Sequence, residues 1–300
     1  MSSPTRTNAR AIVTMVGAMT CFVCNDALVK HVSASLPSAQ LIFLRGVFAS
    51  ALVLLVAWRL GVLHRLSALL NPRVALRGAI DACATMLYLL SLFHLPIANA
   101  TAINLAAPLF MTVFAVLFLG ERAGAGRWSA VVLGFIGVLS IVQPSGNGFN
   151  AWSLLCLLGT LFHATRDLMT RSIDGGIPSI IITLATALAV TLLSGGLTLA
   201  ADWQPVAPRE LGLLAVAAGF LASGYFLLVQ CMRAGDVSLT APFRYCAVLV
   251  AVTLGYLVWG EVPNGWAWLG IALLVGSGLY MLHGERGRAR RAAALEAQPE

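Results

Sequence analysis

Four charged residues lie deep inside apolar stretches of the sequence, where charge is costly. Asp26 and Arg45 lie at similar depth in the first two stretches, and Asp167 and Arg244 lie in the sixth and ninth. If these stretches cross a membrane, ionisable groups inside them are candidates for function. Each acid–base pair could act as a gate that forms in one conformation and breaks in another. Each could equally be a static tie between packed helices.

Asp81 and His163 are candidates for handling protons. No basic residue is expected at the depth of Asp81 in the third stretch, so its carboxyl group could carry a coupling proton. It could equally accept hydrogen bonds from Ser or Thr side chains. His163 could shuttle protons or contact a substrate, or it could simply be hydrogen-bonded inside a helix bundle.

Amide and aromatic side chains in several stretches could form a surface for a small molecule. Such groups suit a zwitterion or a neutral metabolite with an apolar side chain, although aromatic residues in such helices also serve plain packing. No cluster of Lys or Arg is expected at the same depth, which argues against phosphorylated substrates. The substrate-binding candidates are Asn25, Tyr88, Asn104, His163, Tyr225 and Tyr245.

Pro108 and Pro242 interrupt two apolar stretches, the fourth and the ninth. Proline removes a backbone donor and clashes with the carbonyl four residues earlier, here that of Asn104 or Ser238. We expect both prolines to act as hinges in helices that line a cavity. The alternative is a kink that only improves packing.

The composition restricts the elements that can position these residues. Hydrophobic residues make up 59% of the 300-residue chain and charged residues 10%, and the mean hydropathy is +0.87. This excludes a soluble domain, a disordered chain and a disulfide scaffold, and it predicts an all-α polytopic membrane protein. The net charge of +7 comes from residues near helix ends, so nucleic-acid binding is not expected. We expect no metal and no cofactor, because the six cysteines read as packing residues and the five histidines are far apart.

Ten membrane-spanning helices fit this length, since each needs about 20 apolar residues. Lys and Arg near the predicted span ends number fifteen on one side and two (Lys30 and Arg209) on the other, which predicts cytoplasmic N- and C-termini. The predicted spans are 10–32, 38–59, 72–94, 97–119, 126–143, 149–171, 177–200, 208–232, 237–259 and 264–283.

The chain contains an internal repeat. Alignment of the first half of the sequence with the second places Gly120-Glu121 on Gly260-Glu261, Asp26 on Asp167 and Lys30 on Arg171. Each copy holds five spans, an odd number, so the second copy enters the membrane from the opposite side. Inverted repeats of this kind are typical of secondary transporters that hold their substrate near the midplane.

The run from Thr101 to Pro108 that continues to Leu119-Gly120-Glu121-Arg122 resembles the fourth helix of EamA-type members of the drug/metabolite transporter superfamily. Its second copy runs from Leu239 to Pro242 and on to Gly260-Glu261. The first two helices match through Asn25-Asp26 to Lys30 and through Phe43-Leu44-Arg45. Within the superfamily the chain is most similar to YddG-like amino-acid exporters.

This resemblance implies a ten-helix exporter of small metabolites in a bacterial inner membrane. Two five-helix repeats, 10–143 and 149–283, would lie between a tail at 1–9 and a basic tail at 284–300. Amino acids are the expected substrates, carried by alternating access. Sugars, purines, drugs or lipophilic cations are alternatives, as are a channel and an intramembrane enzyme, for which no catalytic constellation is visible. The expected partners are a small molecule and the lipid bilayer, with the chain a monomer or a homodimer.

Overall fold

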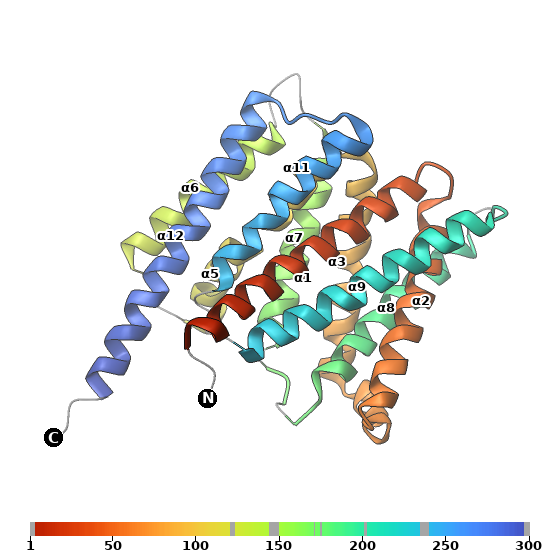
Figure 1. The fold of residues 1–300 in the computed structure, drawn as a ribbon, viewed down its shortest axis with the longest axis horizontal. Coiled ribbons are helices and arrows are strands. Elements are labelled where there is room, and N and C mark those ends of the chain that lie inside the picture. The colour runs from red at the N-terminus through yellow and green to blue at the C-terminus, as the bar shows by residue number, and fades with distance from the viewer. Residues whose placement is uncertain are drawn as a thin grey trace.

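The computed structural model describes residues 4–120, 124–143, 150–170, 172–174, 176–200, 203–234 and 240–296. Within these ranges, side chains are described except at 4–10, 119, 229, 232–234, 241 and 282–296. The regular elements of the described residues are helices, which confirms the all-α prediction (Figure 1). They are α1 (Pro4–Val32), α2 (Ser38–Arg59), η1 (Leu63–Leu70), α3 (Pro72–His94), α4 (Ile97–Asn104), α5 (Ala107–Leu119), α6 (Ala125–Val142), α7 (Ala151–Thr170), α8 (Ser179–Thr198), α9 (Pro208–Ala234), η2 (Ala241–Tyr245), α11 (Cys246–Trp259) and α12 (Gly265–Glu296).

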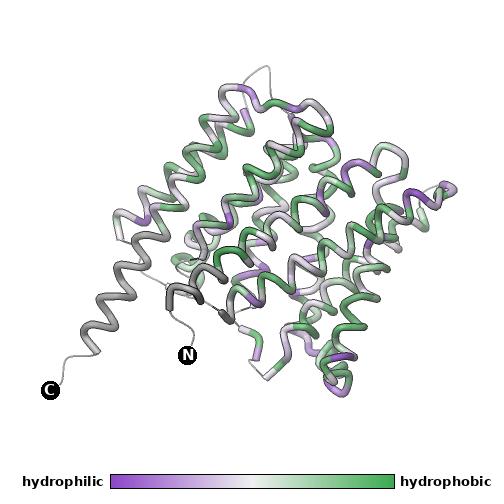
Figure 2. The backbone as a smooth tube through the Cα atoms, in the orientation of Figure 1, coloured by the Kyte–Doolittle hydropathy of each residue, from purple (hydrophilic) through white to green (hydrophobic). Residues whose placement is uncertain are grey.

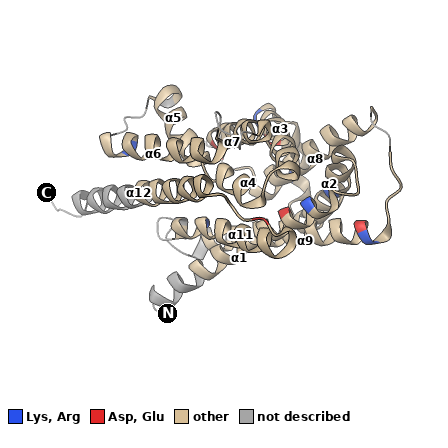
Figure 3. Cartoon of the chain, turned by 90° about the horizontal axis from the view of Figure 1, so that it is seen from above, with Lys and Arg blue, Asp and Glu red and all other residues tan. Residues whose placement is uncertain are grey.

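Eight segments of the described residues are long and apolar enough to cross a membrane. They comprise α1, α2, α3, α4 together with α5, α6, α8, α9, and η2 together with α11. Two further long helices are α7, which carries His163, Arg166 and Asp167, and α12, whose apolar part is shorter. Apolar residues run along the helices in Figure 2, and the ribbon in Figure 3 is mostly neutral with isolated charges. The chain is therefore an all-α multi-pass membrane protein.

The helix boundaries depart from the predicted spans in three places. The predicted span 97–119 is two helices, α4 and α5, with a turn at Leu105-Ala106 between them. The predicted span 237–259 is formed by η2 and α11, and Ser238 lies outside the described residues. α12 continues as a helix to Glu296, beyond the predicted end at 283. Glu121 and Arg171, which the repeat pairs with Glu261 and Lys30, lie outside the described residues.

The packing of the helices is consistent with two equivalent halves. The most extensive contacts join α1 to α9, α3 to α7, α2 to α8 and α6 to α12. If the five segments from α1 to α6 are exchanged with the five from α7 to α12, the first two pairs exchange and the last two map onto themselves. This is the pattern that a pseudo-two-fold axis between the halves produces.

Local chemistry explains several helix ends and one close approach. Gly120 and Gly260 end α5 and α11 in the left-handed region, with φ of 65° and 66°. Glycine carries no steric cost in that conformation. At the edge of the bundle α6 and α12 lie side by side (Figure 1). A Cβ atom on Gly137 would lie 2.8 Å from the carbonyl oxygen of Gly270. Glycine is therefore needed for this close crossing.

Candidate functional site

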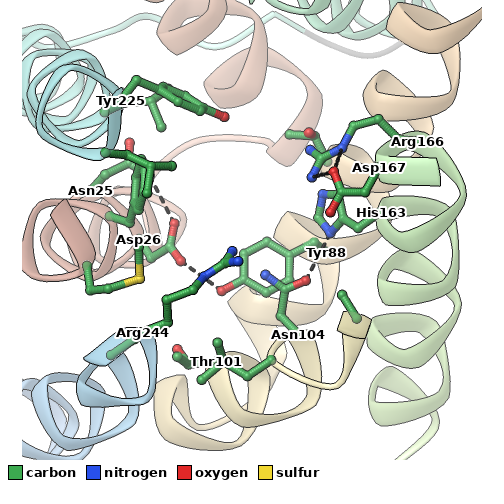
Figure 4. Close-up of a pocket in the computed structure, with 18 of the residues that line it drawn as sticks. Asn25, Asp26, Tyr88, Thr101, Asn104, His163, Arg166, Asp167, Tyr225 and Arg244 are labelled. Atoms are coloured by element: carbon green, nitrogen blue, oxygen red, sulfur yellow. Dashed lines mark hydrogen bonds and ion pairs between the residues drawn. The ribbon is translucent and has the colours of Figure 1, made fainter. Parts of the chain in front are cut away.

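A cavity of about 680 Å³ lies between the two halves of the bundle (Figure 4). Helices α1 to α9, η2, α11 and α12 all contribute to its lining. Apolar side chains such as Met19, Phe22 and Leu105 form much of the wall, and polar and charged groups project from several helices. A mixed cavity of this volume is typical of sites for small organic molecules.

Asp26 on α1 is held by two hydrogen bonds. The Asn25 amide donates to Oδ1 at 2.9 Å, and the Tyr88 hydroxyl of α3 donates to Oδ2 at 2.7 Å. Arg45 of α2 donates to Oδ1 of Asn25 at 3.5 Å rather than to Asp26, so the predicted direct pair of Asp26 with Arg45 is not present in this conformation. Arg45 is only 6% exposed, and its Nε atom has no hydrogen-bond partner.

Arg166 of α7 forms the strongest ionic contacts in the wall. Its Nη1 atom lies 2.6 Å from Oδ1 of Asp81 on α3, and its Nε donates to Asp167 at 2.9 Å. A second cation, Arg77, lies 3.7 Å from Asp81. The expectation that Asp81 has no basic neighbour is therefore wrong. It failed because depth along a helix does not reveal which helix packs against it.

His163 connects the ionic network of Arg166 to the turn between α4 and α5. Its Nδ1 atom lies 2.9 Å from Oδ1 of Asn104, and its Nε2 atom lies 3.9 Å from Asp81. Asn104 is the last residue of α4, so the turn that follows directs its amide toward the cavity. Pro108 lies in the first turn of α5, where its missing N–H group removes no helical hydrogen bond.

The second half presents a cation to the cavity from the short helix η2. Arg244 is exposed, and its guanidinium extends into the cavity (Figure 4) and makes no direct hydrogen bond or ion pair with another described side chain. The predicted partner, Asp167, instead contacts Arg166. Tyr245 follows Arg244 in the lining, and Pro242 lies in the first turn of η2.

The structure brings most of the predicted site residues to one cavity, except Asp81, which lies behind Arg166, and Pro242. Sequence reasoning overlooked Arg166, which it counted as a topology signal near a span end. Arg127 and Thr101 were also missed. The predicted residues in the lining are Asn25, Asp26, Arg45, Tyr88, Asn104, Pro108, His163, Asp167, Tyr225, Arg244 and Tyr245.

The charge of the cavity also departs from expectation. Four arginines line it (Arg45, Arg127, Arg166 and Arg244), against the two carboxylates of Asp26 and Asp167. These arginines come from four different elements, α2, α6, α7 and η2, and were not expected together in one cavity. Arg166 is balanced by Asp81 and Asp167, which leaves a partly compensated site rather than a strongly cationic one.

The cavity reaches only one end of the helix bundle. Its lining includes Arg127 in the first turn of α6 and Thr183 near the start of α8. Toward the opposite end the lining stops at Asp26 and Thr101. Beyond them the side chains are buried, among them Val29, Leu95 and Ile97. The structure is thus open toward the beginnings of α6 and α8 and closed where α1 ends.

The chain matches a known protein family. Residues 9–143 and 150–282 each match the EamA-like transporter family, so the chain belongs to that family and contains two EamA repeats. One solved crystal structure superposes with a TM-score of 0.64 over 93% of this chain and 98% of its own, at 20% identity, and it supports the fold alone.

Named relatives carry several kinds of molecule. A riboflavin transporter from Rhizobium johnstonii is 32% identical over 217 residues, 72% of each chain. The pseudopaline exporter CntI of Pseudomonas aeruginosa is 28% identical, covering 85% of this chain and 89% of its own. An S-adenosylmethionine uptake transporter of Rickettsia conorii is 26% identical, covering 87% and 88%. The chain is therefore an EamA-type secondary transporter of small metabolites and not an enzyme. The relatives do not single out YddG-like amino-acid exporters.

Proposed function

We propose that this protein exports zwitterionic metabolites that carry an amino-acid head group, amino acids being the first to test. The observation that carries the proposal is a set of cationic and anionic groups with unused bonding capacity around one part of the cavity. The guanidinium of Arg244 extends into the cavity and pairs with no described side chain, and the carboxylate of Asp26 lines the same cavity with acceptor positions to spare.

Opposite charges in the cavity match the two ends of a zwitterion. A substrate carboxylate would accept from Arg45 and from Arg244, which has no ionic partner among the described residues. A substrate ammonium group would donate to Asp26, whose carboxylate accepts only two hydrogen bonds from described residues. A carboxylate has about four acceptor positions, so capacity remains for a ligand. Phe22, Tyr225 and apolar residues would contact the remainder of the molecule.

The cavity is larger than a free amino acid requires, so larger molecules with the same head group belong to the proposal. A planar neutral molecule is the second candidate. It is favoured by the riboflavin transporter among the relatives and by the aromatic side chains of Tyr88 and Tyr225 in the lining. Export is the proposed direction, as for the pseudopaline exporter among the relatives.

The proposed mechanism is alternating access in a bacterial inner membrane. Ten spans would form two inverted five-helix repeats, 10–143 and 149–283, with both termini and the tails at 1–9 and 284–300 in the cytoplasm. The eight segments long and apolar enough to cross a membrane, together with α7 and α12, support this number. Pro108 and Pro242 would allow the discontinuous helices to flex.

Counterflow in proteoliposomes tests the substrate class without assuming a coupling ion. Vesicles loaded with unlabelled amino acids should accumulate labelled amino acids saturably, and protein-free vesicles should not. Analogues that lack the amine or the carboxylate should compete at least about tenfold less well, since each loses a charge-assisted hydrogen bond. Accumulation of riboflavin alone, in a preparation that elutes as folded protein, would replace the amino-acid proposal with the second candidate.

A further inference from the structure

The end of the cavity at which α1 terminates is closed by a partly buried ion pair, with the side chain of Lys30 8% and that of Glu261 22% exposed. Nζ of Lys30 lies 2.6 Å from Oε1 of Glu261 and also donates to the carbonyl oxygen of Leu95. The second carboxylate oxygen of Glu261 accepts from the backbone N–H of Ile97 at 2.9 Å. The ammonium group lies 5.1 Å from the ring centre of Trp259. We infer that this Lys30–Glu261 pair is a latch that holds one end of the transporter shut and opens during transport.

The latch joins the segments that would have to separate. Lys30 is in the last turn of α1, and Leu95 and Ile97 flank the junction of α3 and α4, all within the first EamA repeat. Glu261 follows α11 in the second repeat. The contact therefore connects the two repeats, at the end where α11 packs against α1 and α4.

The latch also lies directly beyond the cavity. Asp26 precedes Lys30 by about one helical turn on α1, and Thr101 follows Ile97 by about one turn on α4. Asp26 and Thr101 line the cavity, whereas Lys30 and Ile97 do not. Lys30 is 8% exposed and Ile97 is fully buried, so these residues form a packed layer between the cavity and this face.

The chemistry of the pair suits a contact that must form and break. An ion pair sheltered from water loses hydration when it forms, which offsets most of its attraction, so its net contribution is small when both partners are retained. If the end opens, both charges regain water. Apolar side chains of the same size would gain no favourable hydration when the end opens. The closed state instead requires one particular arrangement of four groups. These are the Lys30 ammonium, the Glu261 carboxylate, the Leu95 carbonyl and the Ile97 N–H.

Sided labelling of a cavity cysteine tests the latch and requires no knowledge of the substrate. Thr101→Cys places a thiol in the buried wall of the cavity. A membrane-impermeant maleimide is applied from the Lys30 face of sealed vesicles, and labelling is quantified by mass spectrometry on a chymotryptic peptide that contains position 101 but not Cys83. Native cysteines therefore do not interfere. In Lys30→Gln and in Glu261→Gln, labelling from this face should be about tenfold faster than in the parent, as a shift toward the open state requires.

Two controls separate a latch from general loosening. Lys30→Arg keeps the charge and should label within about twofold of the parent. Gln40→Leu removes another polar tie at the same end, the paired bonds between Gln40 and the backbone of Gln204, and should leave labelling unchanged. The exchanged pair Lys30→Glu with Glu261→Lys should still label faster than the parent, because a carboxylate at position 30 cannot donate to Leu95 and an ammonium group at position 261 cannot accept from Ile97.

Size-exclusion profiles confirm folding of each variant. The inference is overturned if folded Glu261→Gln and Lys30→Gln label from the Lys30 face at the parent rate. It is also overturned if Gln40→Leu accelerates labelling as much as they do. If Lys30→Gln does not fold, Glu261→Gln and Lys30→Arg decide the question. Failure of amino-acid counterflow would not affect this test, because labelling does not depend on transport.

Discussion

The two ends of the cavity use charged residues in different ways. At the closed end one ion pair, Lys30 with Glu261, crosses between segments and seals the passage. At the open end Arg166 contacts Asp81 and Asp167 along the wall, and the passage between the helices stays clear. A charge in a membrane protein can thus close a path or shape its side. Position relative to the cavity decides which of these roles a charged residue has.

The two sets of charged residues should also differ in whether they matter for stability or for transport. Arg166 and Asp81 join α3 to α7 and are expected to stay paired through the transport cycle, because α3 and α7 pack along much of their length. The latch residues join segments around a mouth and are expected to part. Substitutions at the two ends should therefore have different effects.

Asp81→Leu should have the largest effect on folding. It leaves Arg166 and Arg77 without the carboxylate between them. Loss of one member of a buried pair costs about 3 to 5 kcal/mol. Thermal unfolding of the purified protein should show a clear drop in midpoint temperature, and counterflow should be lost. Asp81→Asn keeps one acceptor oxygen. Its midpoint temperature should therefore lie between those of the parent and Asp81→Leu. A stable and active Asp81→Leu protein would show that the network on the wall is dispensable.

Arg244→Gln should impair transport with little effect on stability. The guanidinium of Arg244 has no hydrogen-bonding or ionic partner among the described side chains, so its removal leaves no buried charge unpaired. If it binds the substrate carboxylate, the counterflow KM should rise about tenfold to a hundredfold. Arg244→Lys should be intermediate, since it retains a charge but not the planar guanidinium. An unchanged KM would remove Arg244 from substrate recognition.

Pro108→Ala tests whether the break between α4 and α5 serves movement. Alanine supplies the missing N–H group and allows a continuous helix through Leu105 and Ala106, which would stiffen the segment. Turnover in counterflow should fall several-fold, on the order of 1 kcal/mol in the barrier, with KM preserved. A variant with parental turnover would support a packing role for the proline.

Gln143→Ala should have the smallest effect. Gln143 contacts Asn264 at 3.0 Å near the closed end, but the contact is exposed to solvent. Exposed surface substitutions usually change stability by less than about 0.5 kcal/mol. Labelling of position 101 from the Lys30 face should match the parent. Acceleration comparable to that in Glu261→Gln would mean that any contact at this end acts as a latch.

Much of the fold and part of the site could be predicted from the sequence. Apolar stretches and turn residues located the helices, and the repeat predicted the equivalence that the helix pairing displays. Polar and aromatic residues such as Asn25, Tyr88 and His163 stood out because they interrupt apolar segments, and they do line the cavity. Periodicity and hydropathy suffice for this level of description.

The ion pairs could not be predicted in the same way. Arg166 and Asp81 are 85 residues apart, and Lys30 and Glu261 are 231 residues apart. Hydropathy gives the depth of a residue but not the helix that it faces. Asp167 was therefore matched with Arg244 at similar depth, whereas its neighbour in the same turn, Arg166, is the actual partner. The repeat offered one unused signal, since it aligns Lys30 with a second basic residue and Glu261 with a second acidic one.

The central claim is that the two ends of the cavity open alternately, and pairs of spin labels measure this most directly. Labels introduced through an unnatural amino acid at Ala34 and Val262 report the closed end, and labels at Ala125 and Asp174 report the open end; all four positions are exposed. Distances are compared between the parent and Glu261→Gln by double electron–electron resonance. The account predicts that the first distance lengthens while the second shortens. Distances that stay fixed, or that lengthen together at both ends, would contradict it.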